Sequence, residues 1–166
     1  PELPPGTSGV VFEALCFLDA ERGWVGGNDI WNRAPSCPRP LAYCVDKPNS
    51  AGGLASIGWL GSPSVAVGGF AVTVANAVPG ALGLFFYGTS GPVSIPFHGG
   101  TLCAQPPFVR LPPFILDGAD GGTQHIALEP GMSGATRRYQ FWHRDPPHPD
   151  GTGVALSNAL QVEFCN

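Results

Sequence analysis

The sequence predicts an all-β fold: an antiparallel β-sandwich or jelly-roll-like domain with about 7–9 short strands and an extended N-terminal segment. Short apolar runs recur at spacings of about ten residues, which is typical of strands joined by tight turns. Gly (24) and Pro (19) make up about a quarter of the 166 residues and fall between these runs. No stretch keeps a helical i, i+3, i+4, i+7 apolar stripe free of Gly and Pro for three turns, so no long helix is expected.

The C-terminal end of the chain has the clearest strand–loop–strand pattern. Tyr139, Phe141 and His143 alternate with residues of different character, which is the period of two expected for a strand. Three prolines within residues 146–149 interrupt the ladder, because proline has no N–H to donate. The alternation resumes over residues 160–164, so we expect a closing hairpin at this end of the chain.

The preceding part of the chain is a series of short strands from residue 55 onward. Turn residues such as Gly61, Pro63 and Pro79 separate the apolar runs. We therefore assign residues 55–166 to the sandwich. The strands that we expect before the closing hairpin are 56–60, 69–76, 81–87, 95–97 continuing to 102–103, 109–111, 114–116 and 124–128.

The N-terminal third of the chain is less regular. Residues 1–18 are predicted to be an extended arm whose apolar run, residues 10–18, forms a strand buried on both faces or, alternatively, a short helix. Residues 19–54 are predicted to be an irregular, disulfide-containing segment, with residues 41–45 as its one candidate strand. The length of the chain fits one domain overall with its own core.

The composition argues against a nucleic-acid partner and against a membrane-spanning segment. Charged residues make up only 12% of the chain, about half the usual share, and the net charge is −4. Arg137 and Arg138 are the only adjacent basic residues, so the chain lacks the basic footprint of a nucleic-acid-binding protein. No run of 18 apolar residues is present, so no membrane span is expected. The chain begins at Pro1 rather than Met, so we expect a processed or trimmed chain.

Five cysteines predict an oxidising compartment. They form no Cys-x-x-Cys metal pair, and in a chain with a single Lys and many Pro and Gly they indicate a disulfide framework. We therefore expect a secreted, extracellular protein. Because five is an odd number, one thiol is free or pairs with another chain. The cysteines are Cys16, Cys37, Cys44, Cys103 and Cys165.

Several segments carry a resemblance to a known kind of domain. They are CVDKPNSAGG (44–53), IGWLGSPSV (57–65), GLFFYGTSGPVSIPFHGGTLC (83–103), YQFWHRDP (139–146) and LSNALQVEFC (156–165). In this order they resemble the motifs NSxGC, xGxPS, GLFFYG, PFxGGxLC, QxWYRDP and LSxxLxxxFC of a C-terminal-type β domain in secreted surface proteins of planctomycetes and related environmental bacteria. The resemblance covers about three quarters of the chain. It implies a secreted all-β domain and implies no activity.

The resemblance also implies a disulfide between Cys103 and Cys165, because both end strands in matching motifs. The second cysteine of the NSxGC motif is a glycine in this chain, so Cys44 has to pair with Cys37 or Cys16 instead. We expect Cys37–Cys44, which leaves Cys16 as a buried free thiol or as a link to another chain. A Cys16–Cys44 bond with Cys37 free is the alternative.

The apolar N-terminal strand predicts self-assembly. Such a strand, attached through a turn-rich lead to a complete domain, is suited to join an open sheet edge of a neighbouring copy. Head-to-tail contacts of this kind do not close and therefore produce filaments. We expect an extracellular structural protein, a subunit of a cell-surface filament or layer that is assembled by N-terminal strand exchange and whose partners are copies of itself. The predicted assembly strand comprises Val10, Val11, Phe12, Leu15, Phe17 and Leu18.

A group of ligand-type residues lies between the two C-terminal strands. His143, Asp145, His148 and Asp150 fall within eight residues, and two imidazoles with two carboxylates offer metal ligands. Their spacing, interrupted by three prolines, matches no zinc template. The preferred interpretation is a proline-stiffened surface loop in which Arg144 pairs with Asp145.

A second acidic feature is a short turn with two aspartates. Asp117 and Asp120 offer oxygen ligands that suit Ca²⁺. The EF-hand spacing is absent, so an ordinary turn between two strands is the preferred interpretation. The metal candidates are thus limited to Asp117, Asp120, His143 and His148, and we expect no cofactor.

No catalytic residue is predicted, so an enzyme is not expected. No Ser lies in a G-x-S-x-G elbow, and the spacing of the aspartates selects no pair for glycoside hydrolysis. Trp24 and Trp31, in the irregular segment, are predicted to offer a flat platform on which sugar rings stack. A carbohydrate-binding or adhesion module with glycan partners is therefore the alternative function, and a secreted hydrolase ranks third.

Overall fold

A computed structural model describes residues 12–17, 23–27, 31–32, 37–118 and 121–166. By its internal contacts the chain divides into two units, Pro1–Ser36 and Cys37–Asn166. The sequence placed boundaries after residues 18 and 54, whereas this division falls immediately before a disulfide-bonded cysteine, Cys37.

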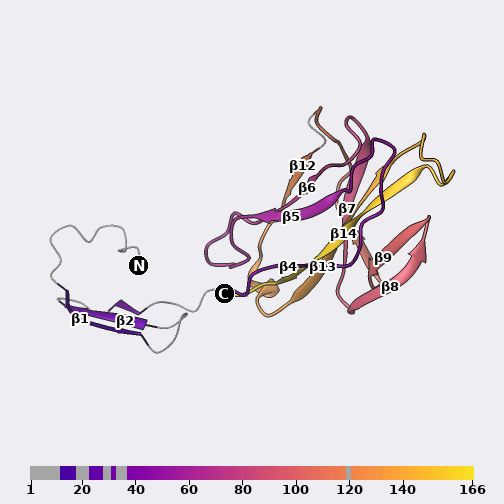
Figure 1. Ribbon diagram of the computed structural model, residues 1–166. Coiled ribbons are helices and arrows are strands. Elements are labelled where there is room, and N and C mark those ends of the chain that lie inside the picture. The colour runs from indigo at the N-terminus through magenta and orange to yellow at the C-terminus, as the bar shows by residue number, and fades with distance from the viewer. Residues whose placement is uncertain (1–11, 18–22, 28–30, 33–36, 119–120) are drawn as a thin grey trace. The chain divides into compact units, whose positions relative to one another are not determined.

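The first unit contains a three-stranded antiparallel sheet in the order β1-β2-β3 (Figure 1). β1 (Phe12–Phe17) pairs with β2 (Gly23–Gly27), and β2 pairs with β3 (Trp31–Asn32). The strand predicted over residues 10–18 is therefore present at Phe12–Phe17, where the helical alternative is wrong. β2 and β3 lie in the segment that was predicted to be irregular. Val10, Val11 and Leu18 lie outside the described residues.

The second unit contains eleven short strands, and their pairing is antiparallel throughout the described residues. This confirms the predicted all-β antiparallel fold. The largest sheet has the order β10-β7-β13-β14-β4, with β11 also paired to β7; a second sheet has the order β12-β6-β5, and β8 pairs with β9. The bounds are β4 (Leu41–Tyr43), β5 (Ser56–Leu60), β6 (Ala71–Ala75), β7 (Leu82–Gly88), β8 (Pro92–Phe97), β9 (Gly100–Ala104), β10 (Phe108–Arg110), β11 (Phe114–Ile115), β12 (Gly122–His125), β13 (Thr136–Arg144) and β14 (Val154–Glu163), with one 3₁₀ turn, η1 (Pro130–Met132).

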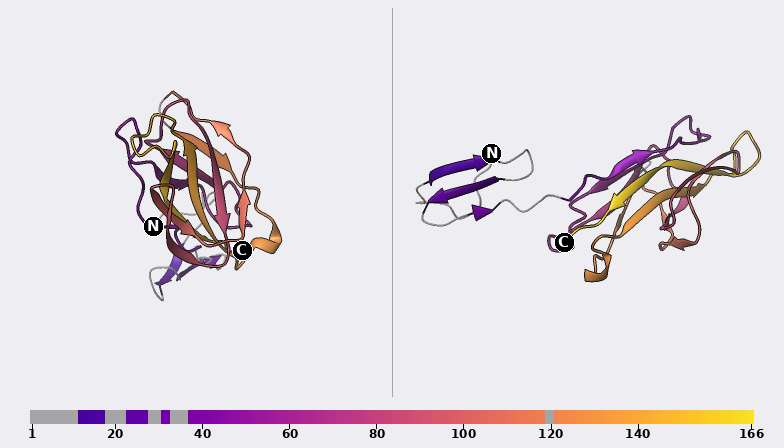
Figure 2. Two further views of the ribbon diagram at one scale, coloured as in Figure 1. Left: turned by 90° about the vertical axis from the view of Figure 1, so that its right-hand side faces the viewer. Right: turned by 90° about the horizontal axis from the view of Figure 1, so that it is seen from below.

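The closing hairpin lies at the centre of this architecture. β13 pairs with β7 on one side and with β14 on the other, so that Tyr139 faces Tyr87 and Leu160 across the two ladders. The β12-β6-β5 sheet and the β8-β9 hairpin lie on opposite sides of the six-stranded sheet (Figures 1 and 2). The loop between β13 and β14 therefore emerges at one end of the sandwich.

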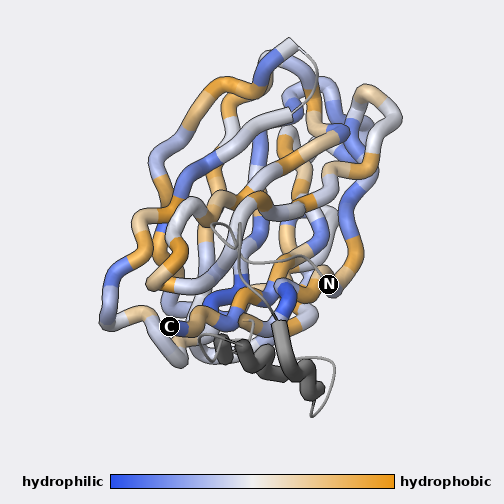
Figure 3. The backbone as a smooth tube through the Cα atoms, turned by 90° about the vertical axis from the view of Figure 1, so that its left-hand side faces the viewer, coloured by the Kyte–Doolittle hydropathy of each residue, from blue (hydrophilic) through white to orange (hydrophobic). Residues whose placement is uncertain are grey.

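The core lies between the six-stranded sheet and the β12-β6-β5 sheet. Figure 3 shows apolar and polar residues interspersed along the backbone of this unit. Because successive side chains of a strand point to opposite faces, the apolar residues on one face of each sheet meet in the core. The ring centroids of Phe85 and Phe141 lie 4.8 Å apart, and those of Phe70 and Phe164, whose rings meet edge to face, lie 5.7 Å apart. Burying each such side chain contributes about 1.5–3 kcal/mol. The largest fully buried apolar side chains are Tyr139, Phe70, Phe85, Phe141, Phe164, Leu156, Leu160, Val72 and Val162.

The disulfides correct the pairing expected from the sequence. Cys37, Cys44, Cys103 and Cys165 are all bonded, as predicted, but the bonds are Cys37–Cys165 and Cys44–Cys103. The expected bonds Cys103–Cys165 and Cys37–Cys44 are therefore wrong. The reason is the antiparallel register between β4 and β14, in which Tyr43 pairs with Ala159 and Leu41 pairs with Gln161. Continued beyond the strands, this register places Cys37 opposite Cys165. The side chain of Cys16 lies outside the described residues.

Candidate functional site

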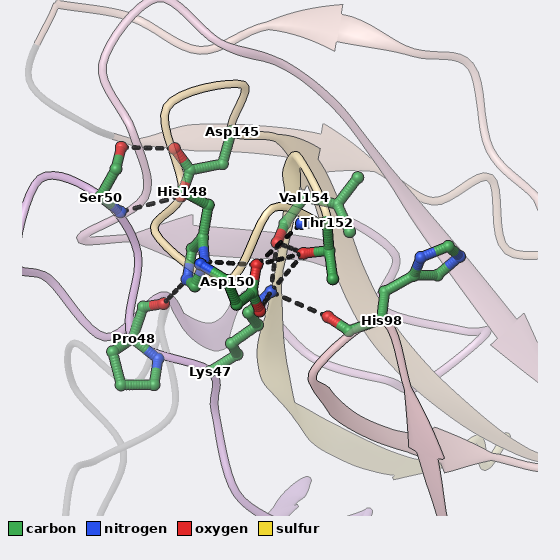
Figure 4. A network of polar contacts seen from close by, with 9 residues as sticks. All are labelled: Lys47, Pro48, Ser50, His98, Asp145, His148, Asp150, Thr152 and Val154. Carbon is green, nitrogen blue, oxygen red and sulfur yellow. Dashed lines mark hydrogen bonds and ion pairs between the residues drawn. The ribbon is translucent and has the colours of Figure 1, made fainter.

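The most distinctive site in the second unit surrounds Lys47, the single lysine of the chain. Its side chain is only 3% exposed. The ammonium contacts four oxygen atoms: the carbonyls of His98 (2.8 Å) and Val154 (2.8 Å), the Thr152 hydroxyl (2.7 Å) and Asp150 Oδ2 (2.6 Å), as Figure 4 shows. We call these four oxygens and the ammonium the ammonium site.

Three chain segments converge at the ammonium site. Lys47 follows β4, and its backbone N–H binds the carbonyl of Leu156 on β14 at 2.9 Å. The second segment is the turn between β8 and β9, where Gly99 has a φ of +71°. A Cβ at this glycine would overlap the Asp150 carboxylate, so the close approach requires glycine. The third segment is the β13–β14 loop, which carries Asp150.

The ion pair dominates the electrostatics of the site. The Lys47 ammonium, which hydrogen-bonds to the carboxylate, holds the pKa of Asp150 well below its usual range. The other carboxylate oxygen accepts hydrogen bonds from the backbone N–H of Thr152 (2.9 Å) and from its hydroxyl (2.7 Å). The carboxylate is therefore ionised and held in one orientation over the physiological pH range.

Asp145 and Ser50 form a second contact between the same loops. Asp145 is fully buried, and its carboxylate accepts hydrogen bonds from the backbone N–H of Ser50 (2.8 Å) and from the Ser50 hydroxyl. The expected pairing of Asp145 with Arg144 is wrong, because Ser50 takes that place and Arg144 is exposed. The Ser50 hydroxyl donates to a carboxylate rather than to a histidine, so this pair does not have the arrangement of an activated serine nucleophile.

The two histidines of the predicted cluster lie in different environments. His143 is fully buried, its ring lies 5.7 Å from that of Phe141, and burial lowers its pKa to about 4. His148 lies on the β13–β14 loop, where Nε2 is 2.8 Å from the carbonyl of Pro48 and Nδ1 is 2.7 Å from Asp150 Oδ1. The strand thus carries one histidine into the core, and the loop holds the other, 10% exposed, between Pro48 and Asp150.

The structure does not bring together Asp117, His143 and His148, the metal candidates that it describes. No group of three His, Cys, Asp or Glu side chains is positioned to hold a metal ion in the described part of the chain. Asp117 Oδ1 accepts the backbone N–H of Gly121 at 2.9 Å, which closes the predicted turn. Asp120 lies outside the described residues.

The predicted glycan platform and assembly strand lie in the first unit. Trp24 is the register partner of Asn32, and Trp31 is the partner of Val25, so the two tryptophans are not opposite each other in the sheet. Of the predicted assembly strand, Phe12, Leu15 and Phe17 lie on β1.

Sequence reasoning missed Lys47 and its partner Thr152. The one available signal was that the chain contains a single lysine, and this alone does not indicate a buried ammonium. The carbonyl ligands of His98 and Val154 have no sequence signal, since every residue carries a carbonyl.

Comparisons with known proteins place this chain in no family. No family model matches this chain, and neither a curated protein nor a solved structure matches it. The family resemblance in the sequence therefore stays a prediction. The two disulfides are consistent with an extracellular protein. Within the residues described, no helix is both long and apolar enough to cross a bilayer.

Proposed function

We propose that the chain is an extracellular structural protein, a subunit of a cell-surface filament or layer in which β1 of one copy joins an open sheet edge of the next. The observation that carries the proposal is that β1 is an edge strand among the described strands of its unit, and that this unit is separate, by its contacts, from the disulfide-bonded sandwich. An edge strand presents a row of backbone N–H and C=O groups to a further strand. Because β1 already pairs with β2, we propose addition along its other edge rather than exchange of a lone strand.

The acceptor that we propose is β4, one of the two edges of the six-stranded sheet. No proline interrupts β4, and Leu41 on it is 62% exposed. Pro92 and Pro96 lie on β8, and their missing N–H groups make β8 a poorer edge for pairing. On β5, the N–H of Ile57 is already bound by Asn158.

Electron microscopy and light scattering of the purified chain test this proposal. We expect filaments or sheets from the unaltered protein and their loss in Leu41→Lys, because a charge at an edge strand opposes pairing with a further strand. The matched control is Val109→Lys on β10, at the opposite edge of the same sheet, where the replaced side chain is also exposed (47%). This control should still assemble.

Two variants in the first unit test the donor strand. Leu15→Pro and Ala14→Pro each remove one N–H from β1. Because successive N–H groups point to opposite edges of a strand, one of the two removes an N–H from the edge that faces the neighbouring copy. At least one of the two should abolish assembly. A strictly monomeric species at high protein concentration, for the unaltered chain, would contradict the proposal.

A further inference from the structure

We propose that the four oxygens around Lys47 form a binding site for a primary ammonium ion, and that the chain fills this site with its own lysine. The ligand class is a small primary alkylammonium, such as n-propylammonium, when the lysine side chain is removed. This inference concerns the sandwich alone and is independent of the proposed assembly.

The oxygen set is the first argument. It consists of two main-chain carbonyls, a hydroxyl and a carboxylate, which are the ligand types that hold hard cations in proteins. The contacts to Lys47 Nζ span 2.6–2.8 Å, which are distances of charge-assisted N–H···O bonds. Ca²⁺–oxygen distances are about 2.3–2.6 Å and Ca²⁺ needs at least six oxygens, so the site favours an ammonium ion over Ca²⁺.

The second argument is that groups other than the lysine hold three of the four oxygens in position. The Thr152 hydroxyl donates to Asp150 Oδ1 at 2.7 Å and so directs a lone pair at the ammonium. His148 Nδ1 lies 2.7 Å from the same carboxylate oxygen. Val154 begins β14, whose ladder fixes its carbonyl. Removing the lysine side chain therefore leaves three of the four acceptors organised.

The third argument concerns charge and access. The site contains one carboxylate and one ammonium, so it is neutral when a monovalent cation occupies it. The Asp150 side chain is 31% exposed, whereas that of Lys47 is 3% exposed. A small cation thus has a route from solvent to the carboxylate once the lysine stem is gone.

Chemical rescue of Lys47→Ala tests the proposal. This variant removes three methylenes and the ammonium, which correspond to n-propylammonium. Without added amine, we expect a loss in Tm of roughly 10 °C, because the carboxylate, the hydroxyl and the two carbonyls all lose the ammonium that they bind. Titration with n-propylammonium chloride, at constant ionic strength set with tetramethylammonium chloride, should raise Tm in a saturable way.

Three controls isolate the site. Tetramethylammonium has no N–H and should give no saturable rise in the Tm of Lys47→Ala. Lys47→Met fills the space of the lysine side chain without a charge, and its Tm should not respond to n-propylammonium. The double variant Lys47→Ala with Asp150→Asn leaves that space empty but lacks the carboxylate, and its Tm response should be lost.

Defined outcomes overturn the proposal. A folded Lys47→Ala protein with the same Tm at all n-propylammonium concentrations would overturn it, and so would an equal response in the Asp150→Asn double variant. If Lys47→Ala does not fold, its oxidative refolding yield is measured with and without n-propylammonium: a higher yield with the amine supports the site, and an unchanged yield overturns it.

Discussion

At the residue scale, burial separates the roles of chemically similar side chains. His143 and His148 lie five positions apart, yet His143 has no exposed surface and His148 hydrogen-bonds at the loop. Burial lowers the pKa of His143 to about 4, while the nearby Asp145 raises it and Lys47 lowers it. His143 is therefore neutral at pH 7 and packs against Phe141 as an apolar ring does.

The neutral state of His143 predicts a specific acid sensitivity. The unfolded histidine binds a proton near pH 6.5 and the folded one near pH 4, so its contribution to stability is complete above pH 6.5 and is lost as the pH falls to about 4. This group alone should remove about 3 kcal/mol from the free energy of unfolding over that range. Urea unfolding at pH 7 and pH 4.5 measures this loss. Between these two pH values, the free energy of unfolding should fall less in His143→Phe than in the unaltered protein; equal falls would show that His143 is not responsible. Stability that depends on Asp150 is lost only at lower pH, because its carboxyl protonates below the usual range.

At the scale of elements, the three-residue strand β4 determines the covalent framework. Its pairing with β14 brings Cys37 opposite Cys165, and the Tyr43 hydroxyl binds the carbonyl of Cys103 at 2.9 Å beside the second disulfide. The bonds close loops with sequence separations of 128 and 59 residues. Both therefore restrict a large part of the unfolded chain.

Removing either disulfide should be costly. On the chain-entropy model, the double variant Cys37→Ala with Cys165→Ala loses about 5 kcal/mol of stability, and the Cys44→Ala, Cys103→Ala variant loses about 4 kcal/mol. Denaturant unfolding of the two double variants measures both losses. Peptide mapping without reduction should recover Cys37 linked to Cys165. A peptide that links Cys103 to Cys165 would contradict the pairing register between β4 and β14.

At the scale of the whole second unit, the exposure of Lys47 reports on the opening of three segments that meet at one end of the fold. Its ammonium ties the segment after β4 to the β8–β9 turn and the β13–β14 loop, so solvent reaches it only when these segments separate.

Amine-selective labelling provides the corresponding prediction. An amine-reactive ester should modify Lys47 very slowly in the native protein and rapidly in denaturant, because the native side chain is 3% exposed. Mass spectrometry of the peptide that contains Lys47 follows the reaction. Thr152→Val, which removes one oxygen ligand, should accelerate native-state labelling, whereas fast labelling of the unaltered native protein would show that the side chain is exposed in solution.

The strand positions could be read from the sequence because strand patterns are local. The expected strand at residues 56–60 matches β5 in full, and residues 81–87 match β7 with a shift of one residue at each end. Alternation with a period of two requires only a few consecutive residues, and the intervening Gly and Pro mark its limits. The same reasoning placed His143 on a strand and His148 in the loop that follows.

The fold class, the approximate strand positions and the presence of a disulfide framework follow from the sequence alone, since these depend on local periodicity and on composition. The pairing of those cysteines and the convergence on Lys47 became known only from the tertiary structure. Both depend on which strands lie side by side and in what register, and this is set by packing between segments that lie about a hundred residues apart in the chain, such as Lys47 and Asp150.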